Sequence, residues 1–99
     1  MEVNKQQLTE IIILSTQKVI SETNAADPAT VIFNTPLYGK GGVLDSLGLV
    51  QLIADVEEEI YQQTGNQITI ADEKAMSMRI SPFRSVSSLS DYIYSILSV

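Results

Sequence analysis

Three segments of this sequence repeat apolar residues at the spacing of one face of an α-helix, and this pattern constrains the fold more than any other feature. They cover residues 5–22, 46–63 and 86–97. Residues 71–78 are predicted to form a further, shorter helix. Because an amphipathic helix has to bury its apolar face against another element, the sequence predicts an all-α fold, a small three-to-four-helix bundle.

A long loop at residues 23–45 is predicted between the first two helices, because asparagine, proline and glycine interrupt this segment repeatedly. Five apolar side chains between these interruptions are expected to pin the loop to the core: Val31, Ile32, Phe33, Leu37 and Tyr38. A loop of this length in a small domain is usually either functional or disordered. The pinning residues favour an ordered, functional loop.

Length and charge limit the organisation and the partners of the chain. Its 99 residues, 44% of them hydrophobic, suit one folded domain over residues 1–99. The net charge of −6 opposes binding to nucleic acid and to anionic membranes, and it favours basic protein partners. The start of the chain does not resemble a signal peptide, and no apolar run approaches the ~20 residues of a membrane span. We therefore expect a cytoplasmic monomer without stable membrane insertion.

The sequence contains neither cysteine nor histidine. Disulfides, cysteine nucleophiles, serine–histidine–aspartate triads and the common histidine and cysteine metal sites are therefore excluded. Aspartate, glutamate, lysine and tyrosine remain, but no cofactor-binding loop accompanies them. We accordingly expect a protein that is not an enzyme and has no catalytic residue or metal site.

Ser46 stands at the predicted start of the second helix, directly after a glycine-rich loop. A helix N-terminus carries a partial positive charge and free N–H groups, which suit a phosphate ester. The plainer alternative is that this serine, or Asp45 before it, only caps the helix by accepting a backbone hydrogen bond. The pattern alone leaves the choice open.

The tripeptide Asp45-Ser46-Leu47 resembles the attachment motif of the acyl carrier protein family, and it occupies the same place after a long first loop. The acidic segment 54–60 and the last helix, with Ser85 and residues 91–93, are also similar to that family. The resemblance covers nearly the whole chain in length and helix order. Its most specific part is residues 44–59.

This resemblance implies that Ser46 carries 4'-phosphopantetheine, transferred from coenzyme A by a phosphopantetheinyl transferase that recognises Asp45 and Leu47. The cargo would be an acyl thioester passed among enzymes of fatty-acid, related lipid or secondary-metabolite synthesis. Candidate residues for an acyl pocket between the helices are Ile12, Leu49, Ile53, Ala71, Met76 and Ile93. Gly48 and Gln51 stand where many fatty-acid carriers have acidic residues, so the chain resembles stand-alone carriers dedicated to one pathway.

Two alternatives to an acyl carrier remain open at this point. An aminoacyl, D-alanyl or peptidyl carrier would share the fold and the motif, and its loading ligase would activate an amino acid. A helical adaptor without phosphopantetheine would use the acidic surface only as an interaction site.

Acidic residues dominate the middle of the chain, where residues 41–73 include seven of them and no basic one. The resemblance implies that the second helix docks basic patches of partner enzymes. The residues expected in this role are Val50, Gln51, Ala54, Glu57 and Glu58. The alternatives are that the acidic residues form an ordinary solvated surface and that Leu47 and Val50 belong to the core.

Overall fold

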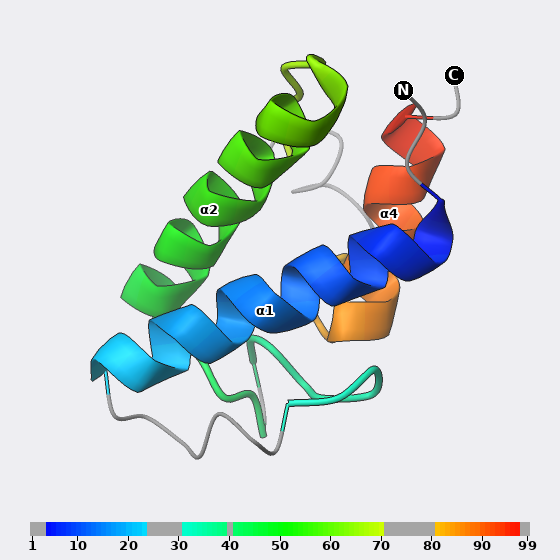
Figure 1. Ribbon diagram of the computed structural model, residues 1–99. Helices are drawn as coiled ribbons and strands as arrows, with labels where there is room; N and C mark the ends of the chain where they lie inside the picture. The colour runs from blue at the N-terminus through cyan, green and yellow to red at the C-terminus, as the bar shows by residue number, and fades with distance from the viewer. Residues whose placement is uncertain (1–3, 24–30, 40, 71–80, 98–99) are drawn as a thin grey trace.

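The computed structural model describes residues 4–23, 31–39, 41–70 and 81–97, and these ranges contain three α-helices. Helix α1 comprises Lys5–Thr23, α2 comprises Ser46–Thr64 and α4 comprises Val86–Leu97 (Figure 1). The three predicted helices are confirmed to within one residue at each end. The described ranges form no β-strand, only an isolated bridge between Pro36 and Ser85. The short helix predicted at residues 71–78 lies outside the described residues.

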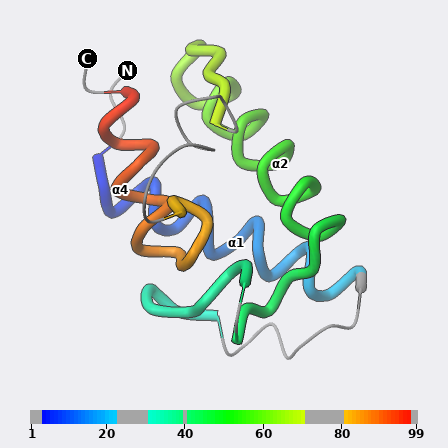
Figure 2. The backbone as a smooth tube through the Cα atoms, turned by 180° about the vertical axis from the view of Figure 1, so that it is seen from behind, coloured from blue at the N-terminus to red at the C-terminus, as the bar shows by residue number. Residues whose placement is uncertain are grey.

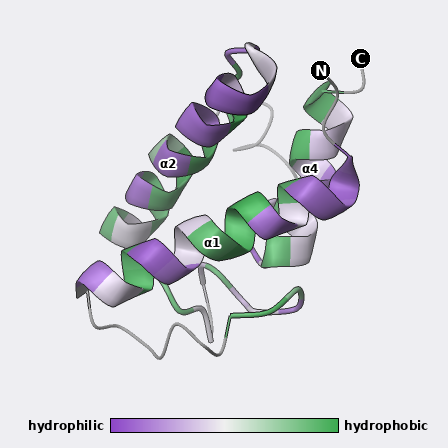
Figure 3. Ribbon diagram, in the orientation of Figure 1, coloured by the Kyte–Doolittle hydropathy of each residue, from purple (hydrophilic) through white to green (hydrophobic). Residues whose placement is uncertain are grey.

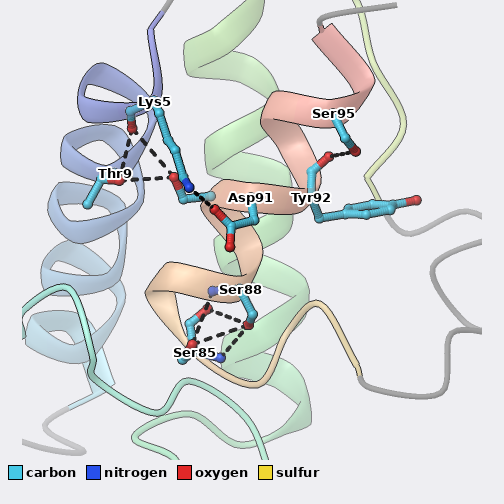
Figure 4. Close-up of polar contacts among 8 residues, drawn as sticks. Lys5, Thr9, Ser85, Ser88, Asp91, Tyr92 and Ser95 are labelled. Atoms are coloured by element: carbon cyan, nitrogen blue, oxygen red, sulfur yellow. Dashed lines mark hydrogen bonds and ion pairs between the residues drawn. The ribbon is translucent and has the colours of Figure 1, made fainter.

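Hydrogen bonds from side chains define where two of these helices begin. Before α1, the N–H of Asn4 donates to Gln7 Oε1 at 2.9 Å and the N–H of Gln7 donates to Asn4 Oδ1 at 2.8 Å. Before α4, Ser85 and Ser88 exchange the same two bonds, at 2.9 and 3.1 Å (Figure 4). Each reciprocal pair satisfies backbone donors that a helix start leaves without partners. Ser85 is therefore confirmed as the cap of the last helix.

Helix α1 is the central element of the bundle. It packs against both α2 and α4, whereas no Cα atom of α2 lies within 8 Å of one in α4 (Figures 1 and 2). The apolar faces of all three helices meet in one core, whose largest fully buried side chains include Leu8, Ile12, Ile20, Leu52, Ile60, Leu89 and Ile93. Among the described residues, no helix is long and apolar enough to cross a membrane.

Polar contacts fix α4 against the first turns of α1. Lys5 forms an ion pair with Asp91, and the hydroxyls of Thr9 and Ser90 are hydrogen-bonded at 2.9 Å (Figure 4). Ser90 is fully buried, so its hydroxyl needs this partner. These contacts set the register of the two helices beside the apolar core.

Residues 33–38 of the first loop are held by backbone hydrogen bonds to the start of α4. The N–H of Leu37 donates to the carbonyl of Arg84 at 2.9 Å, and the N–H of Val86 donates to that of Thr35 at 3.1 Å. Val31 and Leu37 are buried, as predicted. The prediction was wrong for Ile32, Phe33 and Tyr38, which are exposed. Because backbone bonds already anchor the loop, these three side chains are not needed in the core.

Candidate functional site

The start of α2 is capped by Asp45. Its backbone is extended, with φ −87° and ψ −176°, and its side-chain Oδ1 accepts the N–H of Gly48 at 2.7 Å. Its carbonyl accepts the N–H of Leu49 at 2.9 Å, which begins the helical hydrogen-bond series. The sequence did not decide whether Asp45 or Ser46 caps the helix, and the structure identifies Asp45 as the cap.

Ser46 is the first helical residue and is exposed to solvent. Its hydroxyl makes no hydrogen bond to any part of the chain that the structure describes. At this helical position the backbone N–H groups have no partner within the helix. The hydroxyl is therefore accessible, and it lies beside free N–H donors at the positive end of a 19-residue helix.

Gly48 allows the cap to close tightly. A Cβ atom at this position would lie 3.2 Å from Asp45 Oδ1 and 3.3 Å from Leu44 Cδ2, closer than most van der Waals contacts. Leu44 is buried, and its N–H donates to the carbonyl of Leu37 at 2.9 Å. Gly48 is thus explained by local packing between the loop and α2, which the sequence pattern did not reveal.

The outer face of α2, defined here by Leu47, Val50, Gln51, Ala54, Glu58 and Tyr61, is exposed. Leu47 is 80% exposed and Val50 is 65% exposed, so the alternative that they are core residues is wrong. Tyr61 was not singled out from the sequence, although its position seven residues after Ala54 places it on the same face. Figure 3 shows how hydrophilic much of the exposed side of α2 is.

Glu57, which was predicted to dock partners, is not fully exposed, because its carboxylate contacts the segment after α2. It is half-buried, and its Oε2 accepts the N–H of Ile70 at 2.7 Å. This bond attaches the segment after α2 to the helix. Glu57 lines a pocket together with Ala54, Glu58 and Tyr61, so it lies at the edge of the outer face, and its docking role stays a prediction.

Neutral amides hold the other carboxylates of α2. Glutamine Nε2 groups donate at 2.9 Å in three pairs four residues apart: Gln51 to Asp55, Gln62 to Glu58, and Gln63 to Glu59. Such pairs each stabilise a helix by about 0.2–0.5 kcal/mol. They fix the carboxylates without neutralising them, and the described residues include no ion pair to any carboxylate of α2.

The interior residues expected to line an acyl pocket differ in how deeply they are buried. Ile12 and Ile93 are fully buried in the core, and Leu49 and Ile53 are partly buried against it. Ala71 and Met76 lie outside the described residues. In the part of the chain that is described, no three acidic residues lie close enough together to hold a metal ion.

Comparison of the chain with protein-family models, curated proteins and solved structures finds no match.

Proposed function

We propose that this protein is a carrier that bears an acyl group as a thioester on 4'-phosphopantetheine attached to Ser46. The observation that carries the proposal is that Asp45, and not Ser46, caps the start of α2. Asp45 caps the helix through Gly48, which leaves the Ser46 hydroxyl exposed and without a hydrogen bond among the described residues. A serine needed only for capping would engage its oxygen with the backbone.

The attachment step requires only an accessible hydroxyl from this chain. Ser46 Oγ forms a bond to the β-phosphorus of coenzyme A, the phosphoanhydride bond breaks, and 3',5'-ADP leaves with the electron pair. The hydroxyl proton passes to a base on the transferase. The free backbone N–H groups at the start of α2 would stabilise the resulting phosphodiester. Once attached, the arm supplies a terminal thiol that bears the cargo as a thioester.

The outer face of α2 is suited to brief contacts with successive enzymes. It presents exposed apolar side chains, Leu47 and Val50, and about two turns further along the helix the exposed carboxylate of Glu58. Interface cores are commonly apolar, and complementary charge accelerates encounter. We therefore assign the docking of a basic transferase, a loading ligase and acyl-transfer enzymes to this face.

The test is enzymatic loading followed by intact-mass measurement. The protein is incubated with coenzyme A, magnesium and a broad-specificity phosphopantetheinyl transferase. We expect a mass increase equal to one phosphopantetheine, and no increase for Ser46→Ala. The same increase in the alanine variant, or none in the original protein, would contradict the proposal and leave an adaptor role. Because Ser46 is exposed and unbonded within the described chain, the alanine variant should remain folded.

A further inference from the structure

An open groove of about 510 Å³ lies between α1 and α2, apart from Ser46. One stripe of α1 forms its first side, with Glu10, Leu14 and Lys18. Asp55, Glu58 and Glu59 of α2 line the other side. We call this feature the acidic groove, and of its lining only Glu58 also belongs to the outer face of α2.

Leu14 is the exposed apolar residue of the acidic groove. It is 65% exposed, although it lies one turn from the buried Ile11 and on the helix that forms the centre of the bundle. Within the described residues, nothing covers this side of Leu14. A single exposed leucine is unremarkable by itself, but here it lies in a groove surrounded by fixed charges.

The groove carries four carboxylates and one ammonium group. Lys18 is in ion-pair contact with none of the carboxylates in the described chain. Three carboxylates, those of Asp55, Glu58 and Glu59, accept hydrogen bonds from uncharged glutamine amides. Asp55 also retains one oxygen, Oδ2, that is shielded from water and accepts no hydrogen bond from the described residues.

We propose that the acidic groove binds a basic amphipathic helix of a protein partner. The apolar side chains of that helix would cover Leu14, and its arginine or lysine residues would pair with the exposed carboxylates of Glu10 and Glu59. The lining extends over eleven residue steps of α1, from Gln7 to Lys18, and over eight of α2, from Asp55 to Gln63. At 1.5 Å per residue, the two sides are about 16 Å and about 12 Å long, which accommodates about two to three helical turns.

Charge complementarity selects this occupant over a second copy of the chain. A symmetric dimer through the groove would place two sets of carboxylates opposite each other, and each copy carries a net charge of −6. An anionic membrane would be repelled for the same reason. The groove is separate from Ser46, so this proposal does not require the serine to be modified.

The test uses a synthetic helical peptide with arginines four residues apart and leucines on the same face, titrated into the ¹⁵N-labelled protein. We expect saturable shifts of amide resonances in residues 10–18 of α1 and 55–63 of α2. The double variant Leu14→Ser/Glu59→Gln should weaken binding about tenfold or more, since it removes an apolar contact and a charge. Both residues are exposed, so the variant should fold, and its circular dichroism spectrum checks this.

Two matched controls separate the groove from other surfaces. Ile32→Ser removes an exposed apolar side chain from the first loop, and Glu22→Gln removes an exposed carboxylate of α1 outside the groove. The double control variant should bind the peptide as the original protein does. Shifts centred on the outer face, equal weakening by the control variant, absence of saturable binding, or a dimer in analytical ultracentrifugation would each overturn the proposal. Loading of Ser46, measured separately by mass, would be unaffected by any of these results.

Discussion

Replacing Asp45 by alanine removes the acceptor that binds the N–H of Gly48 at 2.7 Å, so the first turn of α2 loses its cap. Loss of a side-chain cap costs about 1 kcal/mol, within a range of roughly 0.5–2. The carboxylate also interacts with the helix dipole, which contributes about 0.3–1 kcal/mol. Asp45→Asn keeps the acceptor and should lose only that smaller part. Ser46→Ala removes a hydroxyl without a described hydrogen bond and should change the free energy of unfolding by less than about 0.5 kcal/mol.

Urea unfolding of the three variants, followed by circular dichroism at the helix band, measures these differences. In thermal unfolding, a loss of 1 kcal/mol in a domain of this size lowers the Tm by about 4–8 °C. The expected order of stability is Ser46→Ala close to the original protein, then Asp45→Asn, then Asp45→Ala. If Ser46→Ala were the most destabilised variant, Ser46 would be the cap, and the inference that its hydroxyl is free would be refuted.

Further predictions concern the packing of α2 and the loop before it. Leu52 is fully buried, so Leu52→Ala should lower the free energy of unfolding by about 2–5 kcal/mol in a urea titration. Leu47→Ala, on the exposed face, should lower it by less than about 0.5 kcal/mol. Equal losses would contradict the assignment of the two faces. Gly65 ends α2 in the left-handed conformation, at φ 76°, so Gly65→Ala should lower the free energy of unfolding by about 1 kcal/mol and Gly65→Asn by less. An unchanged urea midpoint for the alanine variant would contradict the left-handed cap. Gly42→Ala places a Cβ 2.7 Å from the carbonyl oxygen of Leu37, which accepts the N–H of Leu44. The variant should therefore speed hydrogen exchange of the Leu44 amide. Unchanged exchange would contradict this packing.

The three long helices could be predicted from the sequence because their apolar residues recur with one helical period and their ends carry strong signals. Ser85 and Gly65 are such signals, and both act at helix ends in the structure. The stop of α2 at Thr64 also means that Glu57, Glu58 and Glu59 precede the last turn. The unfavourable interaction of their carboxylates with the helix dipole is therefore small.

The first loop and the finer features of the candidate site could not be predicted in the same way. Ile32 and Phe33 are apolar, but the loop is anchored by backbone bonds that no side-chain pattern records. The contact of Glu57 with the N–H of Ile70 depends on where the chain returns after α2, which periodicity does not determine. Leu14 likewise extends the apolar stripe of α1 and remains exposed because no described element covers that side.

The central claim is tested most directly by locating the modification after loading. Trypsin cleaves after Lys40 and Lys74, and residues 41–74 contain no other basic residue, so one peptide carries Ser46. Fragmentation of this peptide should place a single phosphopantetheine on Ser46. The peptide also contains Thr64, Thr69 and Tyr61, which serve as internal alternatives. An unmodified peptide after complete incubation, or a modification on one of those hydroxyls, would contradict the account.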